Sequence, residues 1–149
     1  MASKEALRSI LAAKGRAVWS VLADTSVYDA VLLMAEKDVG ALVVIADGKL
    51  AGMFSERDYA RKVILHGKSS RDVLVREIMS SPVVTVSPEQ TVDECMRIMT
   101  RHRIRHLPVA EGGELVGVIS IGDLVNWIIS AQAATIQQLS SYIAGQYPG

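Results

Sequence analysis

Apolar residues along the chain recur with two periods, one typical of helices and one typical of strands. Two stretches place apolar residues three or four positions apart, which predicts the buried face of a helix. These faces are Val27, Ala30, Val31, Met34 and Ala35, and then Val92, Cys95, Met96 and Met99. Two pairs of short apolar runs follow, 41–45 with 50–54 and 107–110 with 115–119, and each pair is typical of a β-hairpin. Extended runs at 17–21 and 83–86 precede the helices, and further helices are predicted to begin near Ser55 and Ser120. The predicted order is β-α-β-β-α, twice.

The two halves of the chain are an internal repeat. Shifting the sequence by 65 positions aligns residues 18–64 with residues 83–129 without a gap. The identical pairs are Val18/Val83, Val21/Val86, Val27/Val92, Met34/Met99, Leu42/Leu107, Val44/Val109, Leu50/Leu115, Gly52/Gly117, Ser55/Ser120, Asp58/Asp123 and Ile64/Ile129. One copy is too short to bury a good core. We therefore expect an α/β chain of the α+β type, with two β-α-β-β-α repeats packed sheet against sheet in pseudo-two-fold symmetry.

The repeat also divides the chain into segments. We expect a lead-in helix and loop at 1–17, the first repeat at 18–66, a linker at 67–82, the second repeat at 83–129 and a C-terminal helical extension at 130–149. The linker contains VREIM at 75–79, which resembles LRSIL at 7–11, so a short helix is predicted before each repeat. Pro108 lies inside a predicted strand and indicates an edge position or a strand end.

Composition narrows the class of protein. The formal net charge is zero, which argues against a general nucleic-acid binder. The chain has no apolar run of about 18 residues, so no membrane span is expected. Its first residues indicate an amphipathic helix rather than a signal peptide. A single cysteine, Cys95, cannot form an internal disulfide, and we expect a cytoplasmic protein.

Two Ser-x-x-Asp corners are the most informative polar features. Ser55 with Asp58, and Ser120 with Asp123, each stand where a strand is predicted to turn into a helix. One interpretation is plain helix capping by the Ser and the acidic residue. The other is a nucleotide site: the helix start would hold phosphate, the carboxylate would accept hydrogen bonds from a ribose diol, and the preceding glycine would let a ligand approach the backbone.

The segments GALVVIADGKLAGMFSERDYA at 40–60 and IRHLPVAEGGELVGVISIGDLV at 104–125 resemble a pair of CBS (cystathionine β-synthase) domains, the Bateman module. The resemblance extends from about Leu7 to Ile129. It implies a non-catalytic regulatory module that binds an adenosine-containing ligand between the repeats. AMP is the favoured ligand, and ATP, ADP, NAD(H) or S-adenosylmethionine are alternatives. The resemblance also implies a homodimer that changes its conformation or assembly on binding and signals to an effector on another protein.

The resemblance assigns residues to two unequal clefts. In the first, Ser55 and Asp58 would hold the ribose, Val83 and Val84 would lie against adenine, and Arg105 and His106 would reach the phosphates. Pro108 belongs to the same motif and is also assigned to this cleft. Arg57 lies at the helix start, where a positive side chain indicates an anion partner. Arg101, His102 and Arg103 are interpreted as a solvated helix end.

The second cleft would use Ser120 and Asp123, with Val18 and Trp19 against adenine. Gly40 and Ala41 stand where the first cleft has Arg105 and His106 and supply no charge, so Lys14 and Arg16 are the candidates for phosphate contact. The first cleft is therefore predicted to be the better phosphate site.

Two rival functions remain at this point. A dimerisation scaffold without a ligand would also fit the fold, although both Asp residues are intact. An enzyme would need a nucleophile and base, and no catalytic motif is present. Cys95 is expected in the core, and His102 and His106 lack partners at metal-ligand spacing.

The tail is predicted to extend the last helix from Gly122 to about Ala144, roughly 35 Å. Ile129, Ile136, Leu139 and Ile143 keep an apolar stripe along it. This stripe would dock on its own chain or, as we favour, on a second subunit.

Overall fold

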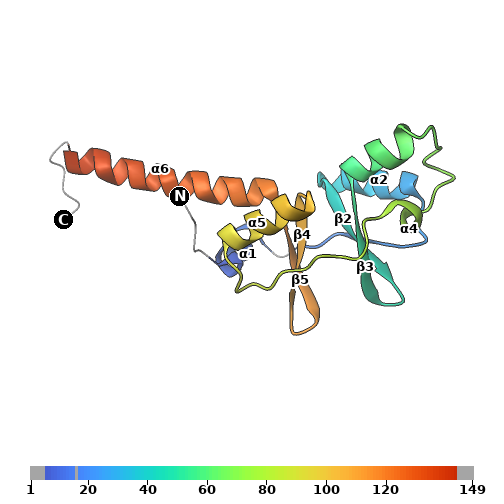
Figure 1. Cartoon of the computed structure of the whole chain (residues 1–149), viewed down its shortest axis with the longest axis horizontal. Coiled ribbons are helices and arrows are strands. Elements are labelled where there is room, and N and C mark those ends of the chain that lie inside the picture. Colours follow the sequence, from blue (N-terminus) through green and yellow to red (C-terminus); the bar gives the residue numbers. More distant parts are fainter. Residues whose placement is uncertain (1–5, 16, 144–149) are drawn as a thin grey trace.

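The computed structural model describes residues 6–15 and 17–143, with side chains as far as residue 140. Two repeats lie side by side, and a long C-terminal helix extends beyond them (Figure 1). The first repeat contains β1 (Ser20–Leu22), α2 (Val27–Lys37), β2 (Ala41–Ala46), β3 (Lys49–Ser55), α3 (Glu56–Tyr59) and a π-helical turn, η1 (Ala60–Ile64). The second contains α5 (Val92–His102), β4 (His106–Glu111), β5 (Glu114–Ser120) and α6 (Ile121–Ile143). The predicted mixed fold of two repeats is confirmed.

The two hairpins match each other residue by residue. Ala41 pairs with Ser55 as His106 pairs with Ser120, and each ladder slips after its fourth pair. Both turn residues have positive φ in each hairpin, at Asp47 and Gly48 and at Gly112 and Gly113. Two successive positive φ angles match the right-handed twist of the strands, so the predicted tight turns are confirmed.

The first strand of the second repeat is a correction to the sequence prediction. Within the described part of the chain, 83–86 forms only one parallel bridge, between Val86 and Val109, whereas β1 pairs with β2 over three positions. In the first repeat the Val43 N–H donates to the Trp19 carbonyl and the Ala23 N–H donates to the Ile45 carbonyl. The equivalent positions are Pro108 and Pro88, shifted by 65. Because proline has no N–H, both outer hydrogen bonds of this ladder are lost.

Both predicted lead-in helices form. The helix that precedes the first repeat packs on the second repeat, and the helix that precedes the second repeat packs on the first. α1 (Leu7–Lys14) places Leu7, Ile10 and Leu11 in the core of the second repeat. α4 (Val75–Ile78) completes the core of the first repeat. The Leu7 N–H donates to the Gln90 carbonyl, and the Arg8 guanidinium pairs with Glu89 and Glu111. The two repeats therefore exchange their lead-in segments.

Gly52 and Gly117 are needed for this exchange. A Cβ on Gly52 would lie 2.8 Å from both Met79 Sδ and the Ser80 carbonyl oxygen, and a Cβ on Gly117 would lie 2.6 Å from Leu11 Cδ2. The sequence interpretation that these glycines admit a ligand is wrong, because segments of the same chain already fill the space.

Helix α6 has 23 residues, as predicted, although the expected end at Ala144 lies outside the described residues. Leu124 is buried in the core of the second repeat, and Trp127 and Ile128 pack partly against it. Within the described residues, no helix is both long and apolar enough to cross a membrane.

Candidate functional site

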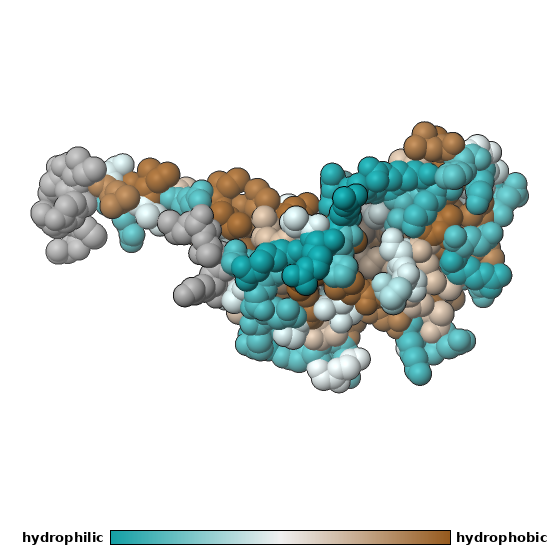
Figure 2. All heavy atoms as spheres, viewed as in Figure 1, coloured by the Kyte–Doolittle hydropathy of each residue, from teal (hydrophilic) through white to brown (hydrophobic). Residues whose placement is uncertain are grey.

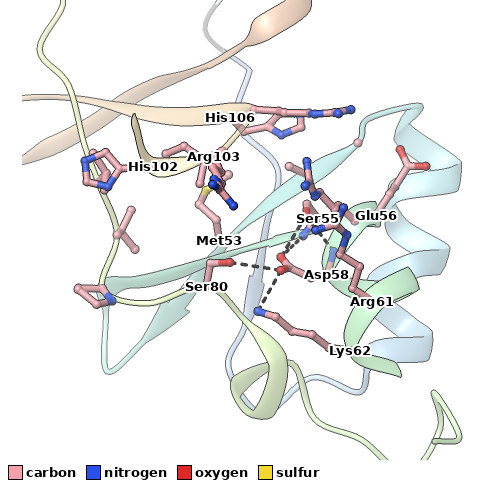
Figure 3. A pocket seen from close by; sticks show the side chains of 18 residues that line it. Met53, Ser55, Glu56, Asp58, Arg61, Lys62, Ser80, His102, Arg103 and His106 are labelled. Carbon is pink, nitrogen blue, oxygen red and sulfur yellow. Dashed lines mark hydrogen bonds and ion pairs between the residues drawn. The ribbon is translucent and has the colours of Figure 1, made fainter. Parts of the chain in front are cut away.

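A cavity of about 580 Å³ lies between the two repeats. The first repeat and the linker supply Gly40, Ala41, Met53, Ser55, Glu56, Arg57, Asp58, Arg61, Lys62, Ser80 and Pro82, and the second repeat supplies Val83, Val84, His102, Arg103, Ile104, Arg105 and His106. Its size is within the range of small-molecule sites in proteins. The residues predicted for the first cleft therefore meet in one cavity, with the exception of Pro108 (Figure 3).

Asp58 is the buried charge at the centre of this cavity. Asp58 is only 8% exposed, and among the described residues it is the one buried residue with a polar or charged side chain. Its Oδ2 accepts the Ser55 N–H and hydroxyl, both at 3.0 Å, and its Oδ1 accepts the Ser80 hydroxyl at 3.2 Å and lies 3.1 Å from Lys62 Nζ. Figure 3 shows Ser80 and Lys62 converging on the carboxylate. The carboxylate is thus fixed in place by four donors.

The capping interpretation of the Ser-x-x-Asp corner is confirmed. The Ser55 hydroxyl accepts the Asp58 N–H at 3.2 Å while Asp58 accepts the Ser55 N–H, which forms a capping box. Ser120 and Asp123 make the same reciprocal pair, at 3.1 Å and 2.8 Å. Capping orients the carboxylate, so the capping interpretation and the nucleotide-site interpretation require the same geometry.

Four arginines around the cavity have no acidic partner. Arg57 and Arg61 come from the first repeat, and Arg103 and Arg105 come from the second. Among the described residues, none of the four arginine side chains takes part in an ion pair or a hydrogen bond. In a chain with no net charge, this arrangement creates a local field that attracts anions.

Arg103 corrects part of the sequence interpretation. It ends α5 in the left-handed region, with φ of 55°, and it lines the cavity together with His102. Asp38, 65 positions earlier, ends α2 with φ of 53°, so the backbone is the same in both repeats and the charge is reversed. The interpretation of His102 and Arg103 as a merely solvated helix end is therefore incomplete.

His106 lies between the two acidic corners. Burial lowers its pKa, Lys14 and Arg105 lower it further, and Asp123 and Asp58 oppose this in part. A Cβ on Gly40 would lie 3.7 Å from His106 Nε2. The start of β2 thus meets the start of β4, as a pseudo-two-fold axis between the repeats requires.

The carboxylate of the second acidic corner is paired with a lysine from α1. Lys14 Nζ lies 2.6 Å from Asp123 Oδ2 and donates to the Val118 carbonyl at 2.9 Å. Burial alone would raise the pKa of Asp123, but the hydrogen bonds from Lys14 and Ser120 outweigh burial and the net shift is downward. Lys14 is therefore engaged with the carboxylate, where the sequence prediction assigned it to a phosphate.

The other residues predicted for the second cleft are dispersed. Gly40 and Ala41 line the first cavity, and the half-exposed Trp19 ring stacks under Lys37, whose Nζ is 4.4 Å from the ring centroid. Val18 is half-buried, and Arg16 lies outside the described residues. Pro108, predicted for the first cleft, is buried in β4 opposite Val118 and does not line the cavity.

Besides His102 and Arg103, sequence reasoning missed seven residues that line the cavity. These are Met53, Glu56, Arg61, Lys62, Ser80, Pro82 and Ile104. Lys62 follows Asp58 by four positions, a spacing that brings side chains together on a helix and could have indicated the pair. Ser80 comes from the linker, and no local pattern pairs it with Asp58.

Neither a reactive thiol nor a metal cluster is found among the described residues. Cys95 is fully buried, as predicted, and burial raises its pKa to about 11, with a smaller contribution from Glu94. A thiol with such a pKa is a poor nucleophile. In the described part of the chain, no three His, Cys, Asp or Glu residues gather in a way that could hold a metal ion.

The family model for the CBS domain matches the chain twice, at residues 15–65 and 75–130. The chain belongs to the CBS-domain family. A solved CBS-domain protein from Burkholderia ambifaria is 51% identical, covers 86% of this chain and 96% of its own, and superposes with a TM-score of 0.83. The CBS-domain protein ATU1752 from Agrobacterium tumefaciens is 39% identical, with 83% and 93% covered and a TM-score of 0.78.

Curated CBS-domain relatives agree with this assignment. The mitochondrial CBS domain-containing protein CBSX3 of Arabidopsis thaliana is 43% identical over 91% of this chain and 68% of its own length. Inosine-5'-monophosphate dehydrogenase of Korarchaeum cryptofilum is 36% identical, but only 22% of that enzyme is matched. The chain is thus a CBS pair of the regulatory type, and its similarity to that enzyme is confined to a minor part of it.

Proposed function

We propose that this CBS pair is a non-catalytic sensor of adenosine nucleotides, with AMP the favoured ligand, and that the nucleotide binds in the Asp58 cavity. The observation that carries the proposal is one cavity that combines a buried, oriented carboxylate with four unpaired arginines. A carboxylate accepts hydrogen bonds from a ribose diol, and arginine forks hold phosphate oxygens. The two kinds of group match the two polar ends of a nucleotide.

The position of Asp58 supports the ribose part of the proposal. Ser80 and Lys62 both contact Oδ1, so ribose hydroxyls would replace internal donors with equivalent donors. Lys62 has a long, flexible side chain that is partly exposed. Replacing these donors by ribose hydroxyls costs little free energy, because the carboxylate keeps its number of hydrogen bonds.

The walls of the cavity support the adenine and phosphate parts of the proposal. Val83 and Val84 are half-buried apolar residues of the lining and offer a surface for adenine. Arg105 and Arg103 belong to the opposite repeat from Asp58. A nucleotide with its ribose on Asp58 and its phosphate on Arg105 would therefore bridge the two repeats and fix their relative position.

The output of such a sensor would be a change in conformation or assembly that a separate effector protein reads. A related CBS-CP12 protein from bloom-forming cyanobacteria is hexameric, 32% identical and superposes with a TM-score of 0.74. This supports assembly as one route of signalling, and for this chain we propose a homodimer. A cytoplasmic location stays a prediction, and the Arabidopsis relative is mitochondrial.

Isothermal titration of AMP into Asp58→Asn and Asp123→Asn tests the proposed site. Asp58→Asn removes the charge that orients the ribose and should weaken AMP binding about tenfold, as expected for a lost charge-assisted hydrogen bond of roughly 1.5 kcal/mol. Asp123→Asn removes the matched carboxylate of the other repeat and should leave the main binding event unchanged.

The same titration decides between a sensor and a scaffold. Adenosine should bind more weakly than AMP, because the arginines act on the phosphate. A wild-type chain that binds neither AMP, ATP, NAD(H) nor S-adenosylmethionine would contradict the proposal and favour a dimerisation scaffold without a ligand.

A further inference from the structure

The C-terminal part of α6 packs against no other described part of its own chain. From Ile129 to Ser140 every side chain is exposed, whereas Leu124 near its start is fully buried in the second repeat. Figure 1 shows this part of the helix extending away from both repeats, and Figure 2 shows apolar residues along it. An isolated helix of this length is only marginally stable in water, so contact with another surface would stabilise it.

The exposed apolar residues of α6 follow the spacing of a coiled coil. Val125, Ile129, Ile136 and Leu139 are 38%, 56%, 63% and 57% exposed. They occupy a and d positions of consecutive heptads, and the sequence continues the spacing at Ile143. Gln132 fills the one polar position in this seam. Spacing of this kind predicts that the partner is another helix packed along the seam rather than a sheet or a loop.

The chemistry of the seam indicates which helix that is. No Asp, Glu, Lys, Arg or His occurs between Leu124 and Ile143, so a charged partner surface would find no complementary charge. An identical helix offers the same apolar residues in return. An amide both donates and accepts, so Gln132 can pair with Gln132 of a second copy. Self-complementary contacts of this type generate the two-fold dimers that are commonest among soluble proteins.

We propose that the exposed a and d residues of α6 form a homotypic helix–helix seam that joins two copies of this chain. The seam lies outside the Asp58 cavity, so it does not depend on nucleotide binding. Residues 125–143 rise about 27 Å, enough for roughly two and a half heptads. Dimerisation through this seam extends a helix pair away from the repeats.

Sedimentation equilibrium tests this seam by comparing the wild-type full chain with the variants Ile136→Lys and Ala134→Lys. The wild type should sediment at twice the chain mass in the micromolar range. Ile136→Lys places a charge at the middle of the seam and should shift the protein to monomer, raising the dimer dissociation constant at least tenfold. Ala134→Lys adds the same charge two residues away, on the opposite face, and should leave the dimer intact.

The two variants also separate association from folding. Both positions are exposed and lie beyond the part of α6 that packs on the second repeat, so both variants should retain the far-ultraviolet circular dichroism of the wild-type core. A wild-type chain that is monomeric in this range, or an Ile136→Lys variant with the same dimer constant as Ala134→Lys, would overturn the proposal.

Discussion

Single side chains set the character of the Asp58 cavity. The carboxylate of Asp58 is buried and surrounded by donors. The side chain of Arg105, in the opposite repeat, is exposed and has no ion-pair or hydrogen-bond partner among the described residues. The cost of burying Asp58 is already offset by Ser55, Ser80 and Lys62. Arg105 is free to meet an anion, so the two residues are expected to contribute to different parts of the ligand.

Arg105→Ala tests this division directly. The variant should weaken AMP binding roughly tenfold, since one charge-assisted contact to phosphate is lost, and should leave the weaker binding of adenosine unchanged. Arg101→Ala is the matched control, because Arg101 is exposed on α5 and does not line the cavity. Isothermal titration with both ligands measures the effect. Equal losses for AMP and adenosine would show that Arg105 acts on the structure of the cavity and not on the phosphate.

Side-chain contacts could be predicted from the sequence where the two residues are close along the chain. The Ser55–Asp58 and Ser120–Asp123 pairs are three positions apart, and spacing alone fixes their capping geometry. The contact of Ser80 with Asp58 joins the linker to a helix 22 positions away, and the pairing of Lys14 with Asp123 spans 109 positions. Contacts of this kind depend on tertiary packing, which no periodicity in the sequence reveals.

Helices and strands show how two copies of one pattern diverge. Hairpins β2–β3 and β4–β5 keep the same register because turn chemistry and alternation are local. The opening strand is lost in the second repeat because Pro88 and Pro108 replace two hydrogen-bond donors. The prolines are visible in the sequence, but their effect on the ladder requires the register, which the sequence pattern left open. The exchange of α1 and α4 between repeats was equally hidden, since an apolar face does not specify which core it joins.

Gly52→Ala and Gly117→Ala test the packing of the exchanged segments on β3 and β5. A Cβ at Gly52 meets the backbone carbonyl of Ser80, which cannot easily shift, so Gly52→Ala should destabilise the fold by about 1–3 kcal/mol. A Cβ at Gly117 meets only the end of the Leu11 side chain, which can rotate, so Gly117→Ala should cost less. Urea unfolding of both variants gives the comparison. A larger loss for Gly117→Ala would contradict the packing described here.

The molecule as a whole is a pair of repeats joined by two exchanged helices and by the contact between β2 and β4. The exchanged helices α1 and α4 fasten each repeat to the other, and the starts of β2 and β4 meet where Gly40 approaches His106. The Asp58 cavity lies along this junction and takes residues from both sides. A ligand held there would stabilise one relative placement of the repeats, and α6 would transmit that placement to a second copy through the seam.

The equivalence of the repeats does not extend to their acidic corners. Lys14 pairs with Asp123, and Gly40 and Ala41 stand at the start of β2 where Arg105 and His106 stand at the start of β4. One nucleotide per chain, held at the Asp58 cavity, is therefore the expected stoichiometry. The fold could be predicted from the repeat, whereas the pairing of Lys14 with Asp123 could not. That the Asp58 cleft is the better phosphate site stays a prediction.

A crystal structure of the full chain with AMP is the most direct test of the Asp58 site. We expect ribose hydroxyls within hydrogen-bonding distance of the Asp58 carboxylate, adenine against Val83 and Val84, and the phosphate beside Arg105. Density for AMP that lies away from Asp58, or that occupies the Asp123 corner in its place, would contradict the proposed site.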